Sequence, residues 1–388
     1  MNDFTYYIPT KIHFGKDALD HLGSEAVNYG KKVLLTYGGG SIKKNGIYDK
    51  VVEELKNAEM EIFELPGIEP NPRIESVREG VDICKKEGID LIIAIGGGST
   101  IDATKFIAAG AKVDFDPWLF ISEDREIPDA LPIFAVLTLA ATGSEMDTGG
   151  VITNLETNEK RAAGAEVMRP KVSFLNPEFT YSVSAYQTAC GSADILSHLF
   201  EIYFNNNDSM YMLDQMMEAL MKTVIKYAPR AIENPEDYEA RANLMWASSW
   251  AINGFLSKTS PKAWSCHPME HELSAFYDIT HGLGLAILTP RWMEYILDED
   301  TVGKFVDYGV NVFGLDKSDN EFAIAKKAID KTAEFFFETL GLDDTLTKIG
   351  IDESKFDLMA QKACSNSSIK GYKELKPEDV KEIYKMCL

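Results

Sequence analysis

The hydrophobic pattern of this chain changes near residue 184, and this change constrains the fold more than any other feature. Before it, short apolar runs alternate with segments of helical period. This predicts strands at 32–37, 61–65, 90–95 and 131–138 and helices at 47–58, 72–86 and 100–109. After it, the apolar period stays close to that of a helix, which predicts helices at 185–203, 209–228, 236–256, 282–297, 301–313 and 320–340.

Strands without polar alternation, separated by helices, are typical of a parallel sheet covered on both faces, with right-handed crossovers. We therefore predict an α/β domain with a parallel sheet over residues 1–184 and an all-α domain over residues 185–388. The boundary is expected in the loop Asn176–Ser184.

The composition excludes several classes of protein. The chain has 388 residues, of which 45% are hydrophobic and 26% charged, as in an ordinary globular protein of two domains. Its formal net charge of −22 repels phosphate backbones, so we expect no nucleic-acid partner. We expect no membrane association, because no apolar run spans a bilayer and the first residues lack an export signal. The five cysteines form no C-x-x-C pair, which favours a cytoplasmic protein without a disulfide framework.

Two glycine-rich loops follow expected strands. In LIIAIGGGSTID, Gly96, Gly97 and Gly98 stand where a strand passes into a helix, a place where backbone N–H groups can hold a phosphate. The spelling is not G-x-G-x-x-G, and a tight turn is the other interpretation. The segment LTLAATGSEMDTGG adds the hydroxyls of Thr138, Thr142 and Ser144, which serve a turn or a nucleotide.

The second loop, GGGSIKKNG, follows the first expected strand. An acidic residue here would bind a ribose 2′-hydroxyl and repel a 2′-phosphate, but the chain has glycine and serine, with Lys43 and Lys44 close by. One hypothesis is that NADPH is accepted, or even preferred. Exposed lysines on a turn are an equal alternative.

Four residues of the second half have the chemistry of a divalent-metal site. Asp194 and His198 are spaced i,i+4 and so share one face of a helix, while His267 and His281 bracket HPMEHELSAFYDITH. One carboxylate with three imidazoles suits Fe²⁺ or Zn²⁺ in a catalytic site. His267 precedes a proline and is expected where the next helix begins, and His281 is expected at the end of a loop. Cys190 and Cys266 are alternative ligands, although buried cysteine is usually a small hydrophobe, and we interpret His13 and His21 as ordinary structural histidines.

Together, GGGSTIDATK, ATGSEMDT, the DILSH helix and an H-x-x-x-H followed by another histidine resemble the iron-containing (group III) alcohol dehydrogenases. Within that family the chain is most similar to the NAD(P)H-dependent butanol dehydrogenases, from IPTKIHFG to about residue 340. The resemblance implies a Rossmann-like, dehydroquinate-synthase-like dinucleotide-binding domain, a helical domain, an active site in the cleft between them, and a homodimer, often with the N-terminal strand crossing to the partner.

The resemblance also implies the residues of the site. Metal ligands carry over onto Asp194, His198, His267 and His281, and His271 matches a histidine beside the metal that is not a ligand. Cofactor contacts, to NADPH or NADH, carry over onto Gly39, Ser41, Asn71, Gly97, Gly98, Ser99, Asp102, Thr138, Thr142 and Lys160. The chain departs from the pattern at Gly149 and Gly150, where many members have bulkier or polar residues, and this could enlarge the substrate pocket.

The predicted activity is hydride transfer between NAD(P)H and short-chain primary alcohols or aldehydes of the butanol/butanal type, with a metal ion that stabilises charge on the substrate oxygen. His271 is predicted to relay a proton or to orient a ligand. The alternatives are a lyase of the dehydroquinate-synthase type, a polyol (glycerol-like) dehydrogenase, and a non-enzymatic protein with a structural metal. A phosphorylated lyase substrate would need basic residues, and segments 190–204 and 264–285 contain no Arg or Lys.

Overall fold

The structure is a computed structural model that describes residues 3–206, 211–257, 264–365 and 367–388. Its backbone contacts divide the chain into two compact units. The sheet unit comprises Tyr7–Val183 and Pro235–Asn253, and the helical unit comprises Met1–Tyr6, Ser184–Asn234 and Gly254–Leu388. Residues 235–253, which the sequence analysis assigned to the helical domain, thus group with the sheet unit. The domain boundary at residue 184 stays a prediction.

The sheet unit is built on six parallel strands, which confirms the predicted parallel sheet, although the sequence analysis named only four of the strands. Their order is β1 (Lys11–Phe14), β8 (Val172–Leu175), β5 (Ile133–Leu137), β4 (Leu91–Gly96), β2 (Lys32–Tyr37) and β3 (Glu61–Leu65). The four expected strands are the adjacent β5, β4, β2 and β3. The two that were not expected, β1 and β8, extend the sheet on one side, and each has only four residues.

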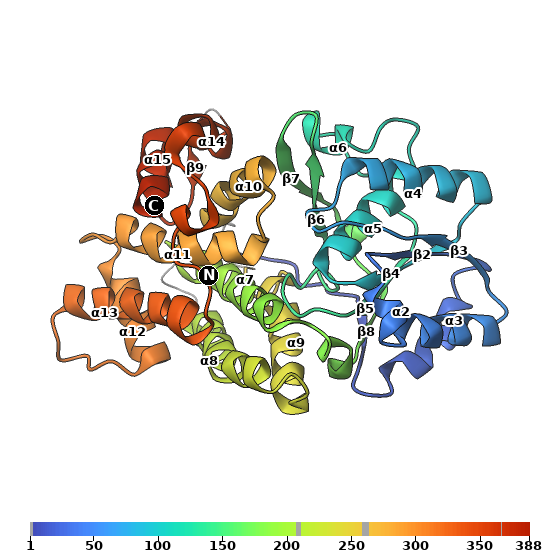
Figure 1. Cartoon of the computed structure of the whole chain (residues 1–388), viewed down its shortest axis with the longest axis horizontal. Helices are drawn as coiled ribbons and strands as arrows, with labels where there is room; N and C mark the ends of the chain where they lie inside the picture. Colours follow the sequence, from blue (N-terminus) through green and yellow to red (C-terminus); the bar gives the residue numbers. More distant parts are fainter. Residues whose placement is uncertain (1–2, 207–210, 258–263, 366) are drawn as a thin grey trace. The chain divides into compact units, whose positions relative to one another are not determined.

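Both faces of this sheet are buried, which explains why its strands are apolar runs without alternation. Leu34 and Ile92 lie in a core with α4 (Ile74–Glu87) and α5 (Gly98–Gly110). Their neighbours along the strands, Leu35 and Ile93, point into a second core with α3 (Ile47–Asn57). Figure 1 shows α4 and α5 on one side of the sheet and α2 and α3 on the other.

Further elements complete the sheet unit. An antiparallel hairpin of β6 (Gly149–Asn154) and β7 (Glu159–Gly164) was not anticipated. α4 begins at Ile74 rather than Pro72, because Arg73 has extended backbone and bridges to Thr153 of β6. The other elements are η1 (Ala18–His21), α1 (Leu22–Ala26), α2 (Ser41–Lys44), α6 (Leu119–Ser122), η2 (Glu166–Met168), η3 (Pro177–Thr180) and α9 (Tyr238–Ile252).

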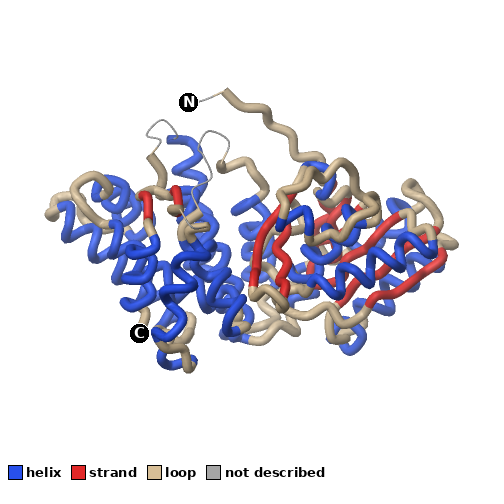
Figure 2. The backbone as a smooth tube through the Cα atoms, turned by 90° about the horizontal axis from the view of Figure 1, so that it is seen from above, coloured by secondary structure: helices blue, strands red, loops and turns tan. Residues whose placement is uncertain are grey.

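The helical unit has the architecture that the sequence predicts. α7 (Ala185–Tyr203) has the predicted bounds, since the Ser184 hydroxyl caps its first turn by accepting from the Gln187 N–H. A two-strand antiparallel hairpin, β9 (Ile369–Lys370) and β10 (Glu374–Leu375), is an addition, seen as the short red segments among the blue helices of Figure 2. The other elements are α8 (Tyr211–Glu233), α10 (Cys266–Tyr277), α11 (His281–Ile296), α12 (Val302–Phe313), α13 (Glu321–Glu334), η4 (Phe335–Thr339), η5 (Thr347–Ile349), η6 (Glu353–Lys355), α14 (Phe356–Ala363) and α15 (Pro377–Met386). Within the described residues, no helix is both long and apolar enough to cross a bilayer.

Candidate metal and nucleotide sites

Three helices of the helical unit bring the four predicted metal ligands together. Asp194 and His198 lie on α7, His267 is the second residue of α10, and His281 is the first residue of α11. The Oδ1 atom of Asp194 is 3.6 Å from the Nε2 of His198, 3.7 Å from that of His281 and 3.8 Å from that of His267. Three imidazoles therefore surround one carboxylate oxygen.

The atoms of this cluster lack the hydrogen bonds that buried polar atoms normally have. In the described part of the chain, Asp194 Oδ1, His267 Nε2 and His198 Nδ1 are buried without a hydrogen-bond partner. Leaving such atoms unsatisfied is costly, so a cation shared by Asp194 and His267 would remove the penalty. The donor atoms of Asp194, His267 and His281 all lie within 4.8 Å of one another, and His198 joins them through the 3.6 Å approach of its Nε2 to Asp194 Oδ1. The cluster fits a single divalent metal ion.

Two buried glutamates support the histidines, and the sequence analysis missed both. Glu201 of α7 and Glu270 of α10 are 2% and 0% exposed, and they hydrogen-bond to Nδ1 of His267 and of His281 respectively. A carboxylate only accepts, so each ring donates from Nδ1, which leaves Nε2 as the ring nitrogen available to a metal. A signal was present: in DILSHLFEIYF, Glu201 follows Asp194 by seven residues and His198 by three, which is the same face of α7.

The electrostatic surroundings give two of the four residues, Asp194 and His198, the protonation state in which they can bind a metal. Burial acts to raise the pKa of the Asp194 carboxyl, but His198, His267 and His281 outweigh it and hold that pKa well below its usual range. Burial lowers the pKa of His198 to about 3, so its ring is neutral. Burial acts to lower the pKa of His267 too, but Glu201 and Asp194 outweigh burial and raise it to about 9. A cation that binds His267 therefore displaces a proton.

The neighbouring cysteines are poor candidates for ligands. Burial raises the pKa of the Cys190 thiol to about 12 and that of Cys266 well above its usual value, so both are neutral thiols in the metal-free protein. Cys190 instead contributes its backbone to helix packing. A Cβ at Gly282 would lie 2.0 Å from the Cys190 carbonyl oxygen, so glycine after His281 lets α11 approach α7 closely.

Two more aromatic side chains stand beside the cluster. The ring of His271 is 6.2 Å from that of His267 and 5.8 Å from that of His281, measured between centroids. The half-buried indole of Trp264 meets the rings of His267 and His198 edge to face, at 4.7 and 5.8 Å. Trp264 was not singled out from the sequence, because an aromatic residue in a loop carries no pattern.

The predicted nucleotide loops lie at the carboxyl ends of adjacent strands of the sheet unit. The first residue of α5 is Gly98, so Gly97, Gly98 and Ser99 are at the start of this helix. The Thr138 N–H donates to the Gly96 carbonyl at 3.0 Å, which joins the loops after β5 and β4. A Cβ at Gly98 would lie 2.4 Å from the Thr142 side chain. Glycine at 98 therefore has a packing role as well as the predicted phosphate role.

The other predicted cofactor residues belong to the same edge. Gly39 and Ser41 follow β2, and the loop after β3 meets them where the Gly67 N–H donates to the Gly38 carbonyl at 3.2 Å. Asn71, in the same loop, has a φ of 50° and is buried. The Thr153 N–H donates to the Pro72 carbonyl at 2.8 Å, and Lys160 pairs with Thr153 across the β6–β7 hairpin. The structure thus gathers these residues along one side of the sheet unit.

The carboxylate of Asp102, a predicted cofactor residue, is engaged in hydrogen bonds within the protein. Its Oδ1 accepts from the Ser144 hydroxyl at 2.6 Å and its Oδ2 from the Val151 N–H at 2.9 Å. Lys105, one turn later on α5, is fully buried and donates to Ser144 Oγ at 2.9 Å, to the Gly149 carbonyl at 2.6 Å and to Asp147. Burial raises the pKa of Asp102 to about 6, although Lys105 acts to lower it. We name Asp102, Lys105, Ser144 and Asp147 the lysine cluster.

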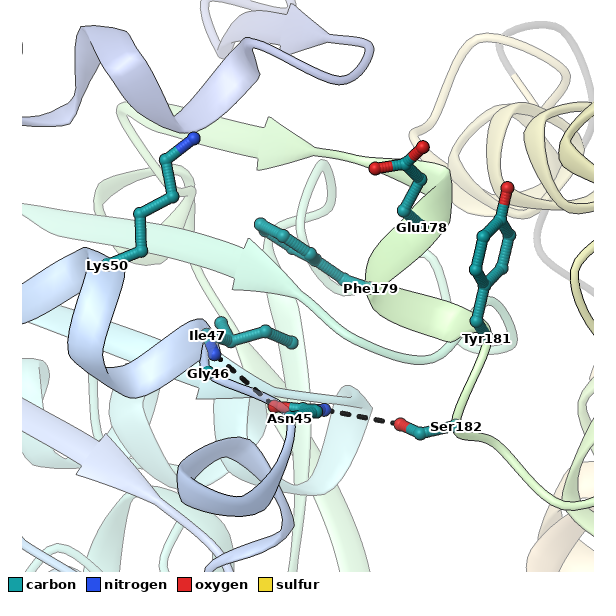
Figure 3. Close-up of a pocket in the computed structure, with 8 residues that line it drawn as sticks. All are labelled: Asn45, Gly46, Ile47, Lys50, Glu178, Phe179, Tyr181 and Ser182. Carbon is teal, nitrogen blue, oxygen red and sulfur yellow. Dashed lines mark hydrogen bonds between the residues drawn. The ribbon is translucent and has the colours of Figure 1, made fainter.

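A cavity of about 370 Å³ opens directly after α2, at the carboxyl ends of β2 and β8. Figure 3 shows Ile47 and Lys50 of α3 on one side and Phe179 and Tyr181 on the other, with Ile47 and Phe179 pointing into the space between, and the Asn45 amide and the Ser182 hydroxyl, 3.2 Å apart, link the two sides. Gly46 and Glu178 complete the lining. This cavity was not anticipated, because its walls come from segments far apart in the sequence.

Comparison with known proteins identifies the family. Residues 9–177 match the family described as iron-containing alcohol dehydrogenase, and residues 188–388 match the C-terminal part of the Fe-containing alcohol dehydrogenase family. The chain belongs to the iron-containing alcohol dehydrogenases. This confirms the family resemblance, the fold class and the class of enzyme predicted from the sequence.

Individual relatives cover almost the whole chain. It is 54% identical to NADH-dependent butanol dehydrogenase B of Clostridium acetobutylicum, over 99% of each chain. It is 37% identical to an NADPH-dependent aldehyde reductase of Escherichia coli, over 93% of each. The crystal structure of NADH-dependent butanol dehydrogenase A from Thermotoga maritima matches with a TM-score of 0.95 at 38% identity, covering 100% of this chain and 99% of that one.

Proposed function

We propose that this protein is a metal-dependent, NAD(P)H-linked alcohol dehydrogenase and aldehyde reductase for short-chain primary substrates of the butanol/butanal type. The observation that supports this most directly is the buried cluster in which Asp194 Oδ1 and His267 Nε2 lack hydrogen-bond partners among the described residues. Relatives named butanol dehydrogenases and an aldehyde reductase favour the substrate class. The family assignment favours a dehydrogenase over the lyase alternative.

Asp194, His198, His267 and His281 would hold the ion, Fe²⁺ or Zn²⁺, with Glu201 and Glu270 fixing two of the rings. When bound, such an ion supplies a Lewis acid that stabilises negative charge on an alcohol or carbonyl oxygen. The neutral His198 ring and the ionised Asp194 need no change of protonation to serve. The indole of Trp264 covers an edge of two imidazoles and gives the site an apolar wall, which suits an alkyl substrate.

We propose the predicted cofactor residues as the dinucleotide site: Gly39, Ser41, Asn71, Gly97, Gly98, Ser99, Asp102, Thr138, Thr142 and Lys160. The start of α5 offers backbone N–H groups to a diphosphate. The cavity after α2 offers Phe179 and Tyr181 to a flat ring such as adenine. Asp102 would contribute chiefly by positioning the Ser144 hydroxyl and the Val151 N–H, which both donate to its carboxylate. Gly149 has room for a side chain, whereas a Cβ at Gly150 would lie 3.3 Å from the Asp102 Cα, so only Gly149 is a candidate for enlarging a pocket.

The nucleotide preference depends on Lys43, the proposed partner of a 2′-phosphate. Its ammonium lies over the Tyr48 ring at 4.3 Å and 3.5 Å from Glu64 Oε2. Glu64 also accepts from the hydroxyls of Tyr48, at 2.6 Å, and Tyr37. The carboxylate partly neutralises Lys43, so we infer that NADPH is accepted without a strong advantage over NADH. The ratio of kcat/KM for the two cofactors tests this inference. A kcat/KM for NADH that is much larger than that for NADPH would contradict it.

His271 is proposed to move a proton between the site and solvent, or to orient His267 or His281. Its half-buried ring lies beside both. A relay predicts that His271→Asn changes the pH profile of kcat, whereas an unchanged profile leaves only the orienting role. The homodimer and the cytoplasmic location stay proposals drawn from the resemblance, to be tested by light scattering and cell fractionation.

The decisive experiment measures metal content and butanal reduction on the same preparation. We expect about one Fe²⁺ or Zn²⁺ per chain and oxidation of NADH or NADPH with butanal, both lost after chelation and restored by the metal. Turnover that survives complete removal of metal would overturn the metal-dependent mechanism. Absence of turnover with butanal in the metal-loaded protein, while another aldehyde or polyol is converted, would overturn the substrate class alone.

A further inference from the structure

Glu201 makes more hydrogen bonds than support of a single histidine requires. One carboxyl oxygen, Oε1, accepts from three consecutive backbone N–H groups, those of Ser265, of Cys266 at 2.6 Å and of His267 at 3.3 Å. The other, Oε2, accepts from the imidazole Nδ1 of His267. All four donors belong to the segment that starts α10, whereas Glu201 lies on α7.

The first turn of α10 needs such an acceptor. The first N–H groups of a helix have no partner within the helix, and a side chain at the N-cap usually accepts from one of them. The N-cap residue of α10, Ser265, makes no capping hydrogen bond, and its hydroxyl oxygen is buried without a partner among the described residues. Glu201 therefore supplies from another helix the cap that Ser265 does not, and its negative charge also suits the positive end of α10.

We propose that Glu201 is a positioning residue that couples formation of the first turn of α10 to the orientation of His267 toward the metal. The proposal rests on the proposed function, because it requires a metal at His267. Since Nδ1 donates to Oε2, the ring nitrogen left to bind a metal is Nε2, the atom 3.8 Å from Asp194 Oδ1. One carboxylate thus holds the ring, and the backbone that carries it, at the same time.

Glu270 provides a matched comparison. It is also fully buried and also hydrogen-bonds to a candidate ligand, His281, but its other oxygen accepts from the hydroxyl of Ser274. A hydroxyl can reverse its role: with Gln at 270, the amide N–H₂ could donate to Ser274 Oγ while Ser274 donates to the Ile279 carbonyl, 3.3 Å away. The amide oxygen would still accept from His281, so the bonds to His281 and Ser274 could both persist.

Gln at 201 has no such solution. Three of its partners are backbone N–H groups, which only donate. If the amide oxygen faces the backbone, the N–H₂ group faces His267 and forces its proton from Nδ1 to Nε2, where it blocks the metal. If the oxygen faces His267, the N–H₂ group faces the backbone N–H groups and the cap is lost. The first arrangement weakens metal binding, and the second weakens α10 in the metal-free protein.

The test compares Glu201→Gln with Glu270→Gln in the full chain, with two readouts that do not involve catalysis. Affinity for Co²⁺ is measured by competition with a chelator, and the thermal midpoint is measured on metal-free protein. We expect Glu201→Gln to lose about 10- to 100-fold in Co²⁺ affinity, or to unfold at a lower temperature without metal, and Glu270→Gln to stay within about 3-fold in affinity. Glu218→Gln, a buried carboxyl bonded to Tyr203, Gln215 and Asn311, is the control and should keep wild-type affinity.

Wild-type affinity together with a wild-type midpoint in Glu201→Gln would overturn the proposal. So would an equal loss in Glu270→Gln, which would mean that any buried charge near the histidines has the same effect. If Glu201→Gln does not fold, Glu201→Asp, which keeps the charge but has a shorter reach, is measured in its place with the same outcomes. A wild-type protein that binds no Co²⁺ would instead overturn the proposed function, while the metal-free midpoints still report on the cap.

Discussion

Each unit of the molecule contains a buried cluster of charged side chains, and the two clusters are balanced differently. In the sheet unit, the ammonium of Lys105 makes three hydrogen bonds, to Ser144, Asp147 and Gly149, and so brings its own cation to the acidic side chains. In the helical unit, Asp194 is surrounded by imidazoles, and Asp194 Oδ1 and His267 Nε2 remain without hydrogen bonds among the described residues.

The comparison suggests how a structural ionic cluster differs from the proposed metal site. Buried ionisable groups occur in both, and so do shifted pKa values, so neither property distinguishes them. The distinguishing property is whether donor and acceptor atoms are satisfied within the protein. The lysine cluster has its cation in the chain, whereas the histidine cluster has buried atoms, Asp194 Oδ1 and His267 Nε2, without hydrogen-bond partners among the described residues.

The largest expected effect is at the histidine cluster. His267→Ala removes an imidazole whose Nε2 is 3.8 Å from Asp194 and leaves Glu201 with its backbone partners only. We expect loss of bound metal and a fall of several orders of magnitude in kcat, measured by metal analysis and a butanal assay. His21→Ala, a replacement in the sheet unit where His21 stacks on His13, is the control and should change neither. One metal ion per chain and near-normal turnover in His267→Ala would contradict the assignment of His267 as a metal ligand.

A smaller effect, a loss of stability, is expected when the lysine cluster is changed. Added metal should not restore that stability. Lys105→Met leaves the half-buried Asp102 and Asp147 without their cation, which we expect to cost at most about 3–5 kcal/mol of unfolding free energy. Chemical denaturation followed by circular dichroism, with and without added Zn²⁺, measures it. The partly exposed Lys112, 3.6 Å from Asp129, provides the control, since Lys112→Met should change stability by less than about 0.5 kcal/mol. Equal stabilities of Lys105→Met and Lys112→Met would show that the lysine cluster contributes nothing net.

The comparison also shows what the sequence can predict. The central strands and α7 were predicted well because burial determines where apolar residues occur. A strand that is buried on both faces is a continuous apolar run, and a buried helix has apolar residues at the helical period. The four metal-ligand candidates were found because histidine is rare in this chain and two ligands share a helix turn. β1 and β8 were missed because strands of four residues carry too little pattern.

Contacts between residues that are far apart in the sequence could not be predicted from it. α9 was expected as a helix, yet its grouping with the sheet unit depends on Gly143, where a Cβ would lie 2.5 Å from the Ser248 carbonyl oxygen, and on the bond from Ser249 to Glu145. Lys105 and Glu201 look like ordinary charged residues of helices, and only the fold shows that they are buried. Periodicity predicts which face of a helix is covered, but it does not identify what covers it.

The smallest effect concerns Glu145, a buried carboxyl beside the lysine cluster. It accepts from the Ser249 hydroxyl through one oxygen, and the other has no hydrogen-bond partner among the described residues. Burial raises its pKa from 4.5 to about 7, and the charge of Asp147 adds to this while Lys105 opposes it. The folded state thus holds this proton more tightly than the unfolded state. The resulting stability is fully present below pH 4.5 and is lost as the pH rises through 7.

Glu145→Gln removes this titration while keeping the shape of the side chain. Relative to wild type, the variant should gain at most about 3 kcal/mol of stability between pH 4 and pH 8, with the change confined to the interval from 4.5 to 7. Denaturation midpoints of both proteins across this range measure the difference. A difference that is flat with pH would mean that Glu145 is ionised in the fold, which would require Lys105 to balance a third carboxylate and would make the lysine cluster the more strongly charged of the two.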